Sequence, residues 1–293
     1  MVEAARKYKR IVQIGSQGRS QPHKQKAMQL LRDGVIGKVY LAKGLCYKRR
    51  KSIGHAEDAP APAGVDWDKF LGPAPMRPFN ALRFKYNWHW FWDTGNGDIG
   101  NQGVHEMDIA RWGLGKPGLP KAVVSTGGKY VYVDDQETPN TQIATFDYGD
   151  AETVFEVRGI LTGGEGGLAL EGQNVIGDLF YGGDGWMCVS GTGFQVYKGE
   201  KSEKIMDEKG NSSAMPHYRN FLQAVRSRNP KDLTADVEVG VTSACLVHLA
   251  NISYRTGRKL AFDPAAMKFL ADAEANRMLT RDYRKPYVVP ERV

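Results

Sequence analysis

The sequence predicts an α/β protein of the α+β kind, in which a large open-faced, mainly antiparallel sheet carries helices on one side. Three observations support this class. Helix, strand and helix follow one another within about the first 35 residues, short apolar runs joined by Gly or Asp turns follow from residue 38, and two amphipathic helices come late in the chain. We therefore divide the chain into a small part, 1–36, and a large part, 37–293.

The small part has the rhythm of a parallel α/β unit. Residues 1–9 have helical periodicity, residues 10–15 (RIVQIG) form a short apolar run typical of a buried strand, and residues 21–32 form a helix that Asp33 and Gly34 end. A parallel strand needs neighbouring strands and helices on both faces. We therefore expect this part to be the end of a domain that begins upstream.

The large part alternates short strands with tight turns. Its two predicted helices cover residues 213–228 and 236–256, the second stopped by Gly257, and residues 60–78 form a Pro-rich loop. Turns such as Tyr148-Gly149-Asp150 are typical of antiparallel pairing. The predicted strands are 38–47, 122–132, 141–148, 152–160, 174–181, 186–190 and 194–197.

Composition favours a soluble, cytoplasmic protein. Hydrophobic residues make up 41% and charged residues 25%, and no apolar run approaches the roughly 18 residues of a membrane span. The three cysteines are far apart, so we expect reduced thiols. A targeting segment upstream of Met1 is the alternative for the compartment, and no membrane partner is expected.

The net charge of +7 would suit an acidic partner, but the basic residues do not form a recognisable binding motif. The one dense run, Lys48-Arg49-Arg50-Lys51, is interpreted as a solvated loop. We therefore expect no nucleic-acid partner.

Residues 87–112 (NWHWFWDTGNGDIGNQGVHEMDIARW) predict a small-molecule site, and a sugar is the expected ligand. Aromatic side chains precede a glycine-rich loop, which runs into a short helix that begins with His105. Alternation along a strand-like segment would direct one set of side chains to the core and the other to the loop, and sugars stack their C–H faces on indole. The expected substrate contacts here are Trp88, His89, Trp90, Trp92 and Asp93, with a core role as the alternative for each tryptophan.

The spacing of Gly95, Gly97 and Gly100 spells G-x-G-x-x-G, the dinucleotide fingerprint. That fingerprint requires a buried apolar strand before it and an acidic residue about twenty positions later, and neither is present. We interpret the spacing as a coincidence and expect no cofactor for this chain alone. A metal site at His89, Asp93 and His105 fits no established ligand spacing, so no metal is expected.

Several segments in order, IVQIGSQGRSQP, LLRDGVIGKV, VDWDKFLGPAPMRPFN, WFWDTGNGDIGNQGVHEMDIARW, YRNFLQAVRS and YRTGRKLAFDP, resemble the Gfo/Idh/MocA family of sugar oxidoreductases. The likeness covers nearly the whole chain and is most specific over residues 65–112. Family members carry an N-terminal Rossmann domain for NAD(P), followed by an open-faced α/β domain that binds substrate and forms the dimer. The resemblance implies a member lacking the phosphate loop, the ribose carboxylate and the Glu-Lys-Pro lysine. Residues 1–36 would be the remnant of the dinucleotide-binding domain, and residues 37–293 the substrate-binding and dimerisation domain.

The resemblance also implies roles for individual residues. His105 matches the family's acid/base histidine, whose ordinary pKa near ~6.5 suits removal of a hydroxyl proton; capping the helix start is the alternative. The family's Asp position falls on Asn101, which cannot accept a proton, so Asp98 is a candidate substitute or a turn former. Asp108 is expected to orient the imidazole or to pair with Arg111. Arg49 and Tyr181 are predicted substrate contacts.

Three functions remain open on the sequence. The chain is the sugar-binding part of an NAD(P)-dependent oxidoreductase, a cofactor-independent carbohydrate-active enzyme (glycoside hydrolase or lyase) that uses His105 with Asp93, Asp98 or Glu106, or a non-catalytic sugar-binding or dimerising module. The partner in each case is a sugar or glycoside. A homo-oligomer through the sheet face is also expected, because a bare sheet face tends to be covered.

Overall fold

One ten-stranded sheet dominates the computed structural model, which describes residues 1–290. The strand order is β10-β9-β2-β3-β4-β1-β5-β6-β7-β8; β1 and β4 are parallel, and the other neighbouring pairs are antiparallel. The predicted class, a mainly antiparallel open sheet with helices, is confirmed. The strands are β1 (Val39–Lys48), β2 (Ala122–Gly128), β3 (Thr141–Asp147), β4 (Glu152–Arg158), β5 (Asn174–Gly182), β6 (Gly185–Val189), β7 (Gly193–Lys198), β8 (Glu203–Lys209), β9 (Leu260–Asp263) and β10 (Lys268–Phe269).

All the strands predicted in the large part are present, and three further strands were missed. β8 has the sequence EKIMDEK and forms an edge of the sheet, where charged side chains face water and no apolar alternation is needed. β9 and β10 are too short to produce a pattern. The missed strands therefore lie at the two margins of the sheet.

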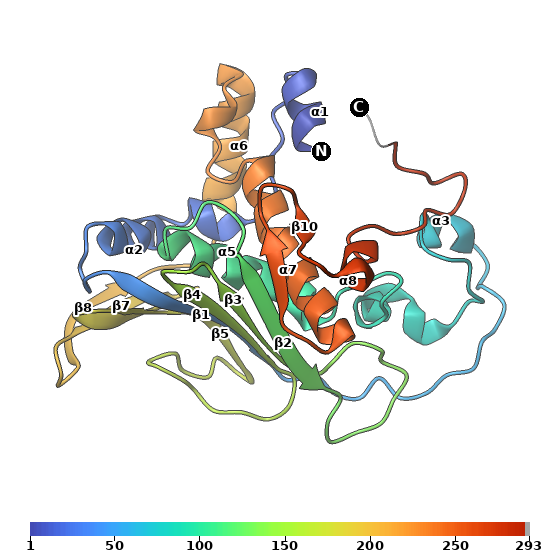
Figure 1. Cartoon of the computed structure of the whole chain (residues 1–293), viewed down its shortest axis with the longest axis horizontal. Coiled ribbons are helices and arrows are strands. Elements are labelled where there is room, and N and C mark those ends of the chain that lie inside the picture. Colours follow the sequence, from blue (N-terminus) through green and yellow to red (C-terminus); the bar gives the residue numbers. More distant parts are fainter. Residues whose placement is uncertain (291–293) are drawn as a thin grey trace.

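The helices lie on one side of the sheet and loops lie on the other (Figure 1). Three of them pack on the strands or on each other: α2 (Pro22–Arg32), α5 (Gly103–Gly113) and α7 (Val237–Thr256). Gly257, at φ +69°, ends α7 as predicted, because this left-handed conformation favours glycine. The remaining helices are α1 (Val2–Lys7), α3 (Trp67–Leu71), α4 (Asp98–Asn101), α6 (Met215–Ser227) and α8 (Ala273–Arg277), with 3₁₀ turns at Gln17–Ser20, Ala81–Arg83, Lys85–Trp90 and Pro230–Asp232.

Glycine at position 44 lets α5 approach the centre of the sheet. A Cβ at Gly44 of β1 would lie 2.9 Å from the Phe155 ring and 3.3 Å from the Cβ of Glu106. Phe155 is fully buried and also fills the space beside Gly103, where an added Cβ would lie 2.6 Å from its ring. These contacts fix the first turn of α5, which carries His105.

The other face of the sheet is partly open. Ile143 of β3 is 42% exposed there. Next to it, Lys43 of β1 forms ion pairs with Glu156 (2.7 Å) and with Glu165 (2.6 Å), which belongs to the loop after β4. The hydroxyl of Tyr47 donates to the same two carboxylates, at 2.9 and 2.7 Å. This network holds the loop against the sheet.

The strand predicted at residues 10–15 is wrong. Gln13 forms a single β-bridge with Asp236, and the neighbouring backbone bonds join Ile14 to Ala235 and Val12 to Val237. The segment therefore pairs with the turn before α7, because no strand of residues 1–290 offers it a parallel edge. The helices on either side of it, α1 and α2, are present as predicted.

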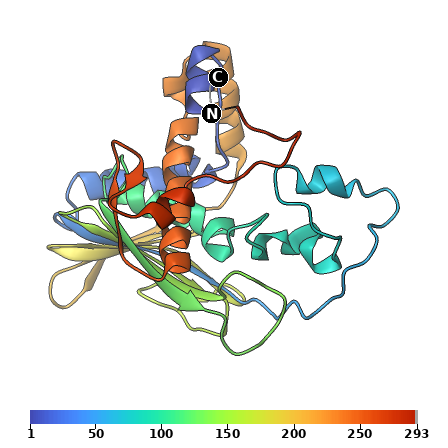
Figure 2. The same ribbon diagram turned by 45° about the vertical axis from the view of Figure 1, so that its right-hand side comes forward.

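The strand-like alternation predicted for the tryptophans is also wrong. Residues Lys85–Trp90 form a 3₁₀ turn, so their side chains do not alternate between two faces. The Pro-rich loop likewise contains the short helix α3. The segment that contains α3 and the 3₁₀ turn at Lys85–Trp90 extends beyond one end of the sheet, and we call it the excursion (Figures 1 and 2).

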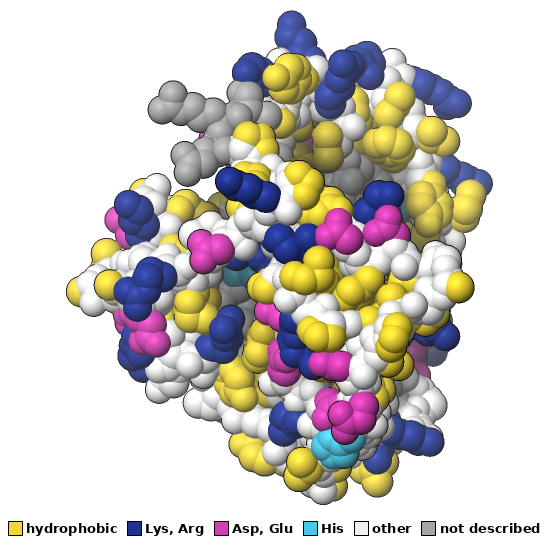
Figure 3. Space-filling model, turned by 90° about the vertical axis from the view of Figure 1, so that its right-hand side faces the viewer, with side chains coloured by type: hydrophobic (Ala, Val, Ile, Leu, Met, Phe, Trp, Pro, Cys, Tyr) yellow, Lys and Arg dark blue, Asp and Glu magenta, His cyan; other side chains and the backbone are white. Residues whose placement is uncertain are grey.

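Basic and acidic side chains lie side by side on the face that carries this excursion, with apolar side chains among them (Figure 3). Within the described part of the chain, none of the helices combines the length and apolar character needed to cross a membrane.

Candidate functional site

His105 lies in a cavity of about 230 Å³, which we call the site cavity. It opens between the 3₁₀ turn before α2, the start of α5, the start of β5 and the β6–β7 turn. Its polar lining residues are Ser16, Gln17, Gln21, Lys24, Gln102, His105, Glu106, Asp108, Glu171, Thr192 and Ser212. The cavity is therefore lined mainly by amides, hydroxyls and titratable groups.

The His105 ring forms no hydrogen bond with any of the described residues, although it is largely buried. Burial lowers its pKa, and the positive charges of Lys24 and Lys48 act in the same direction, while Asp108 opposes them. The imidazole is therefore neutral at pH 7, with a free nitrogen able to accept a proton or a hydrogen bond.

Lys24 and Gln21 bring polar groups from α2 and the residue before it to the cavity. Lys24 is only 7% exposed, and its ammonium forms no hydrogen bond with another described group. The amide oxygen of Gln21 is buried and also lacks a partner. The unpaired Lys24 ammonium in the cavity wall therefore favours a polar occupant.

Glu106 is the most strongly perturbed acid that lines the cavity. Burial raises its pKa from 4.5 to about 7, while Lys24 and a hydrogen bond from Gln102 lower it in part. The Gln102 amide donates to both carboxylate oxygens, at 3.2 and 3.0 Å.

The raised pKa of Glu106 predicts a pH-dependent stability. Between pH 4.5 and about 7, Glu106 keeps its proton in the folded protein but has lost it in the unfolded chain. Its contribution to the stability of the folded state is therefore complete below pH 4.5 and disappears as pH rises through about 7. The change is on the order of 3 kcal/mol. Urea titrations at several pH values should show the unfolding free energy falling over this range, and Glu106→Gln should remove its share of that slope. Glu171→Gln, at the exposed rim, should retain it.

Asp108 has a structural role. It is 1% exposed and accepts hydrogen bonds from Arg19 at 2.6 and 3.0 Å and from Ser243 at 2.6 Å; Arg111 lies 3.5 Å away. The predicted pairing with Arg111 is present, but the closer partner is Arg19, which the sequence did not indicate. This ion pair ties the segment before α2 to α5 and so forms one wall of the site cavity.

The aromatic residues predicted to contact substrate do not line the site cavity. Trp90 is 4% exposed and packs beneath the Arg50 guanidinium, 5.0 Å from its ring, so it belongs to the core. Trp88 stacks on His89 at 3.7 Å, and Trp92 lies 5.2 Å from the guanidinium of Arg255. Trp88 instead lines a separate cavity of about 280 Å³ together with Asp93, and the role of these aromatic residues in substrate binding stays a prediction.

The remaining predicted contacts are engaged elsewhere. Asp93 pairs with Arg77 at 2.7 Å, and Arg49 donates to backbone carbonyls of its own loop and of Gly159. Tyr181 lies beside the Trp186–Tyr197 stack on the other face of the sheet. Of the predicted residues, His105 lines the site cavity, as do Glu106, the carboxylate named for the hydrolase alternative, and Asp108.

Asp98 and Asn101, the two residues predicted to assist His105, also have protein partners. Asp98 is 4% exposed and accepts two hydrogen bonds from Arg50, at 2.8 and 2.7 Å. The amide of Asn101 donates to the hydroxyl of Tyr86 and to Asp98, at 3.1 and 3.3 Å. Both side chains are therefore held by protein partners, and neither lines the site cavity.

The glycine spacing at residues 95–100 does not fit a dinucleotide. A 3₁₀ turn precedes it instead of a strand, and α4, which follows, has four residues. A Cβ at Gly95 would lie 2.3 Å from the backbone of His89, and one at Gly100 would lie 2.5 Å from the Cβ of Asn96. These glycines allow close packing within the protein and form no open cradle for a phosphate. This geometry agrees with the interpretation of the G-x-G-x-x-G spacing as a coincidence.

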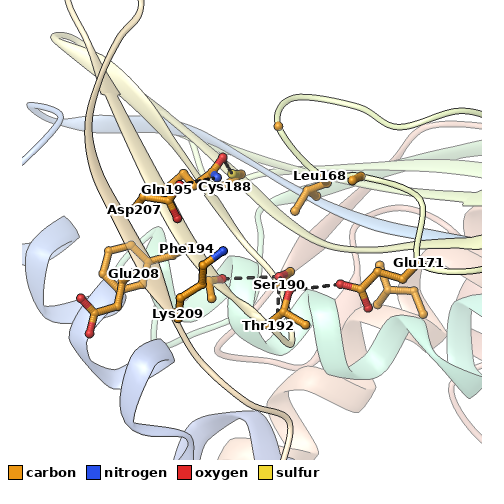
Figure 4. Close-up of a pocket in the computed structure, with 14 residues that line it drawn as sticks. Leu168, Glu171, Cys188, Ser190, Thr192, Phe194, Gln195, Asp207, Glu208 and Lys209 are labelled. Atoms are coloured by element: carbon orange, nitrogen blue, oxygen red, sulfur yellow. Dashed lines mark hydrogen bonds between the residues drawn. The ribbon is translucent and has the colours of Figure 1, made fainter.

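A second cavity of about 190 Å³ adjoins the site cavity and shares Glu171, Ile176 and Thr192 with it. Figure 4 shows its polar side chains linked: the Thr192 hydroxyl donates to Glu171 at 3.1 Å and bonds to Ser190 at 3.0 Å. These residues were not predicted, because loops joined only by tertiary structure supply them.

A larger cavity, about 930 Å³, lies near α1 and the C-terminal end of α5 and contains none of the predicted site residues. Its arginines already have partners: Arg6 pairs with Asp236 at 2.5 Å, and Arg19 and Arg111 both approach Asp108. We therefore place the candidate site at His105.

Comparisons with known proteins agree with this fold. The model of the Gfo/Idh/MocA oxidoreductase family's C-terminal α/β domain matches residues 42–289. A search of curated proteins found no match.

Solved structures share the fold at low sequence identity. A putative oxidoreductase from Thermotoga maritima has 15% identity and a TM-score of 0.61, over 89% of this chain and 67% of that one. Aldose-aldose oxidoreductase from Caulobacter crescentus, complexed with glycerol, has 14% identity and a TM-score of 0.61, over 89% and 67%. The WlbA dehydrogenase from Bordetella pertussis, in complex with NADH and UDP-GlcNAcA, has 16% identity and a TM-score of 0.56, over 89% and 66%. The present chain thus spans about two thirds of the length of each. Because the family model covers most of its residues, the chain belongs to the Gfo/Idh/MocA oxidoreductase family and contains the family's C-terminal α/β domain.

Proposed function

We propose that the protein binds a sugar or a related polyol in the site cavity and that His105 is the acid/base group of this site. The observation that carries the proposal is the unpartnered His105 ring in a cavity whose lining combines amides and hydroxyls with titratable groups. A sugar hydroxyl both donates and accepts hydrogen bonds, which matches side chains such as Gln17, Gln21 and Thr192. The cavity can hold one small ring or an open-chain polyol.

The chemistry at His105 would be proton transfer from a ligand hydroxyl. A neutral imidazole can accept the proton of an O–H group within hydrogen-bond reach, and Lys24 would favour the negative charge that develops on oxygen. Oxidation of the alcohol also needs a hydride acceptor, which NAD(P) supplies in an oxidoreductase. The glycine loop of this chain does not fit such a cofactor, so the role of His105 is limited to the proton.

Relatives support the choice of ligand class. The Caulobacter crescentus protein is named as an aldose-aldose oxidoreductase and was crystallised with glycerol, and the Bordetella pertussis protein with a UDP-sugar. We carry this chemistry over only as a class, polyhydroxylated small molecules, because sequence identity to both is low.

His105→Ala is expected to weaken binding of a polyol probe roughly tenfold, since one hydrogen bond of about 1–1.5 kcal/mol is lost. Isothermal titration with glucose, with myo-inositol and with glycerol would measure the effect. His89→Ala is the matched control, because His89 lies outside the cavity and stacks on Trp88. Equal affinity of both variants for a probe that binds the wild type would rule out His105 as a ligand contact.

The glycoside hydrolase or lyase alternative depends on a carboxylate beside His105. Glu106 lines the same cavity, whereas Asp93 and Asp98 do not, and glycosidases need two carboxylates across the scissile bond. Hydrolysis of chromogenic glycosides without NAD(P), lost in Glu106→Gln, would favour this alternative. A non-catalytic sugar-binding module would bind a probe but turn over nothing.

We also propose that the partly open sheet face mediates self-association. Ile143 is exposed there, and Tyr181, Trp186 and Tyr197 form a half-buried aromatic cluster on the same face. Sedimentation velocity should show a dimer or larger species, and Ile143→Lys should shift it toward monomer. A wild-type monomer at all concentrations would contradict this assignment.

A further inference from the structure

Two acidic side chains meet between α5 and the sheet. Glu106 projects from α5 with its Cβ directly over Gly44 of β1, 3.3 Å from the position a Gly44 Cβ would occupy. Asp178 of β5 is the register partner of Gly44 on the neighbouring strand. Residues paired across antiparallel strands point to the same face, with Cβ positions about 5 Å apart. Asp178 therefore projects toward α5 next to Glu106.

The Asp178 side chain has no partner among the described residues. It is fully buried, and neither carboxylate oxygen accepts or donates a hydrogen bond. An isolated carboxylate in such a place would cost several kcal/mol, and the group protonates instead. Burial, together with the nearby Glu106 and Asp108 charges, raises the pKa of Asp178 well above its ordinary value, while Lys24 lowers it.

Glu106 differs from Asp178 because it reaches the site cavity. It is 4% exposed, lines the cavity and has one amide donor, Gln102. Two neighbouring buried carboxyl groups do not both ionise readily, so a neutral Asp178 leaves Glu106 as the member that gains and loses a proton. The other titratable groups around Glu106 are Lys24 on α2, Cys46 and Lys48 on β1, and His105 and Asp108 on α5.

We propose that Glu106 is a second ligand-binding acid–base group of the site cavity, and that the unpartnered carboxyl group of Asp178 behind it acts on the protonation of Glu106 as its neutral neighbour. Protonated Glu106 donates a hydrogen bond to a ligand oxygen, and ionised Glu106 accepts one from a ligand hydroxyl. With its ordinary pKa, Glu106 would be ionised near neutral pH and could only accept hydrogen bonds. Burial raises its pKa to about 7, so it can either donate or accept a hydrogen bond near neutral pH. The site then contains two acid–base groups for the same ligand: His105, which is neutral without its second proton, and Glu106, which is negative without its proton. The ligand contact rests on the proposed sugar-binding function, whereas the protonation states do not.

Infrared spectroscopy of the carboxyl C=O band tests the protonation states without any ligand. We expect two buried protonated-carboxyl components at mildly acidic pH, one that disappears near pH 7 and one that titrates separately from it, at a pH well above the ordinary range of an aspartic acid. Glu106→Gln should remove the first component and Asp178→Asn the second. Asp178→Asn replaces a neutral group with a neutral one, so it should fold; Glu171→Gln, at the exposed cavity rim, should leave both components unchanged. Absence of both components at every pH at which the protein is folded would overturn the proposal.

The ligand contact is tested by calorimetric titration of glucose and myo-inositol at several pH values on both sides of neutrality. The affinity of the wild type should change across this range, and that of Glu106→Gln should change at least threefold less. An unchanged pH profile in this variant would overturn the ligand role while leaving the binding function of the cavity intact. If neither probe binds the wild type, the sugar-binding function and the Glu106 contact both fail for these probes, and the infrared titration separately decides the acid pair.

Discussion

Replacing Asp108 with alanine is expected to destabilise the folded protein by about 3–5 kcal/mol, because Arg19 and Arg111 would keep their positive charges in a buried place without a counter-ion. The side chains of Arg19, Arg111 and Asp108 are 10%, 4% and 1% exposed, respectively. Chemical denaturation should show the midpoint falling with little change in slope. The loss should also weaken binding in the site cavity, since the Arg19 contact holds one of its walls.

Two further variants separate the buried charge from a general effect of losing a carboxylate. Asp207→Ala removes an exposed carboxylate that pairs with Lys204 at 2.8 Å, and its loss should have little effect on stability, because solvent screens an exposed pair. Asp108→Asn keeps the hydrogen-bond acceptor without the charge and should fall between the two. Equal stability of the Asp108→Ala and Asp207→Ala proteins would contradict the structural role assigned to Asp108.

Replacing Phe155 with alanine is expected to cost about 3–5 kcal/mol, because this fully buried ring fills the space left by two glycines. A Cβ at Gly44 would lie 2.9 Å from the ring and one at Gly103 2.6 Å, so neither of these positions offers a side chain that could fill the cavity that alanine leaves. Thermal and urea denaturation would measure the loss. Because Gly103 opens α5, the affinity of the site cavity for polyol probes should fall as well.

Ile205→Ala is the matched control for Phe155→Ala. Ile205 lies on β8, the edge strand of the same sheet, and is 49% exposed, so its truncation should change stability by less than about 1 kcal/mol. If both variants lose similar stability, Phe155 does not fix the start of α5 in the way its contacts indicate.

Periodicity in the sequence predicted most of the architecture. Apolar runs separated by Gly or Asp turns identified every strand from β1 to β7, and helical periodicity located α2, α6 and α7. The failures have physical causes. A charged edge strand such as β8 needs no apolar face, and a single apolar run such as residues 10–15 cannot reveal whether a neighbouring strand is present.

The candidate site was less predictable than the fold. A family resemblance pointed to His105, and the structure places His105 in a cavity, but the aromatic residues around it in sequence lie elsewhere. The 3₁₀ turn at Lys85–Trp90 directs them into the core and the excursion. Of the cavity residues missed, Gln17, Gln21 and Lys24 lie in or just after the segment IVQIGSQGRSQP, whose resemblance to the family was the available signal.

The sequence by itself determined the fold class, the family and the candidate histidine, because these depend on local periodicity and on a contiguous pattern of residues. Tertiary structure alone decided which groups accompany that histidine. Lys24 comes from α2, Glu171 and Thr192 come from loops, and Asp178 reaches Glu106 only because Gly44 leaves room between two strands and a helix. Such neighbours are far apart along the chain, and no spacing in the sequence records the packing that unites them.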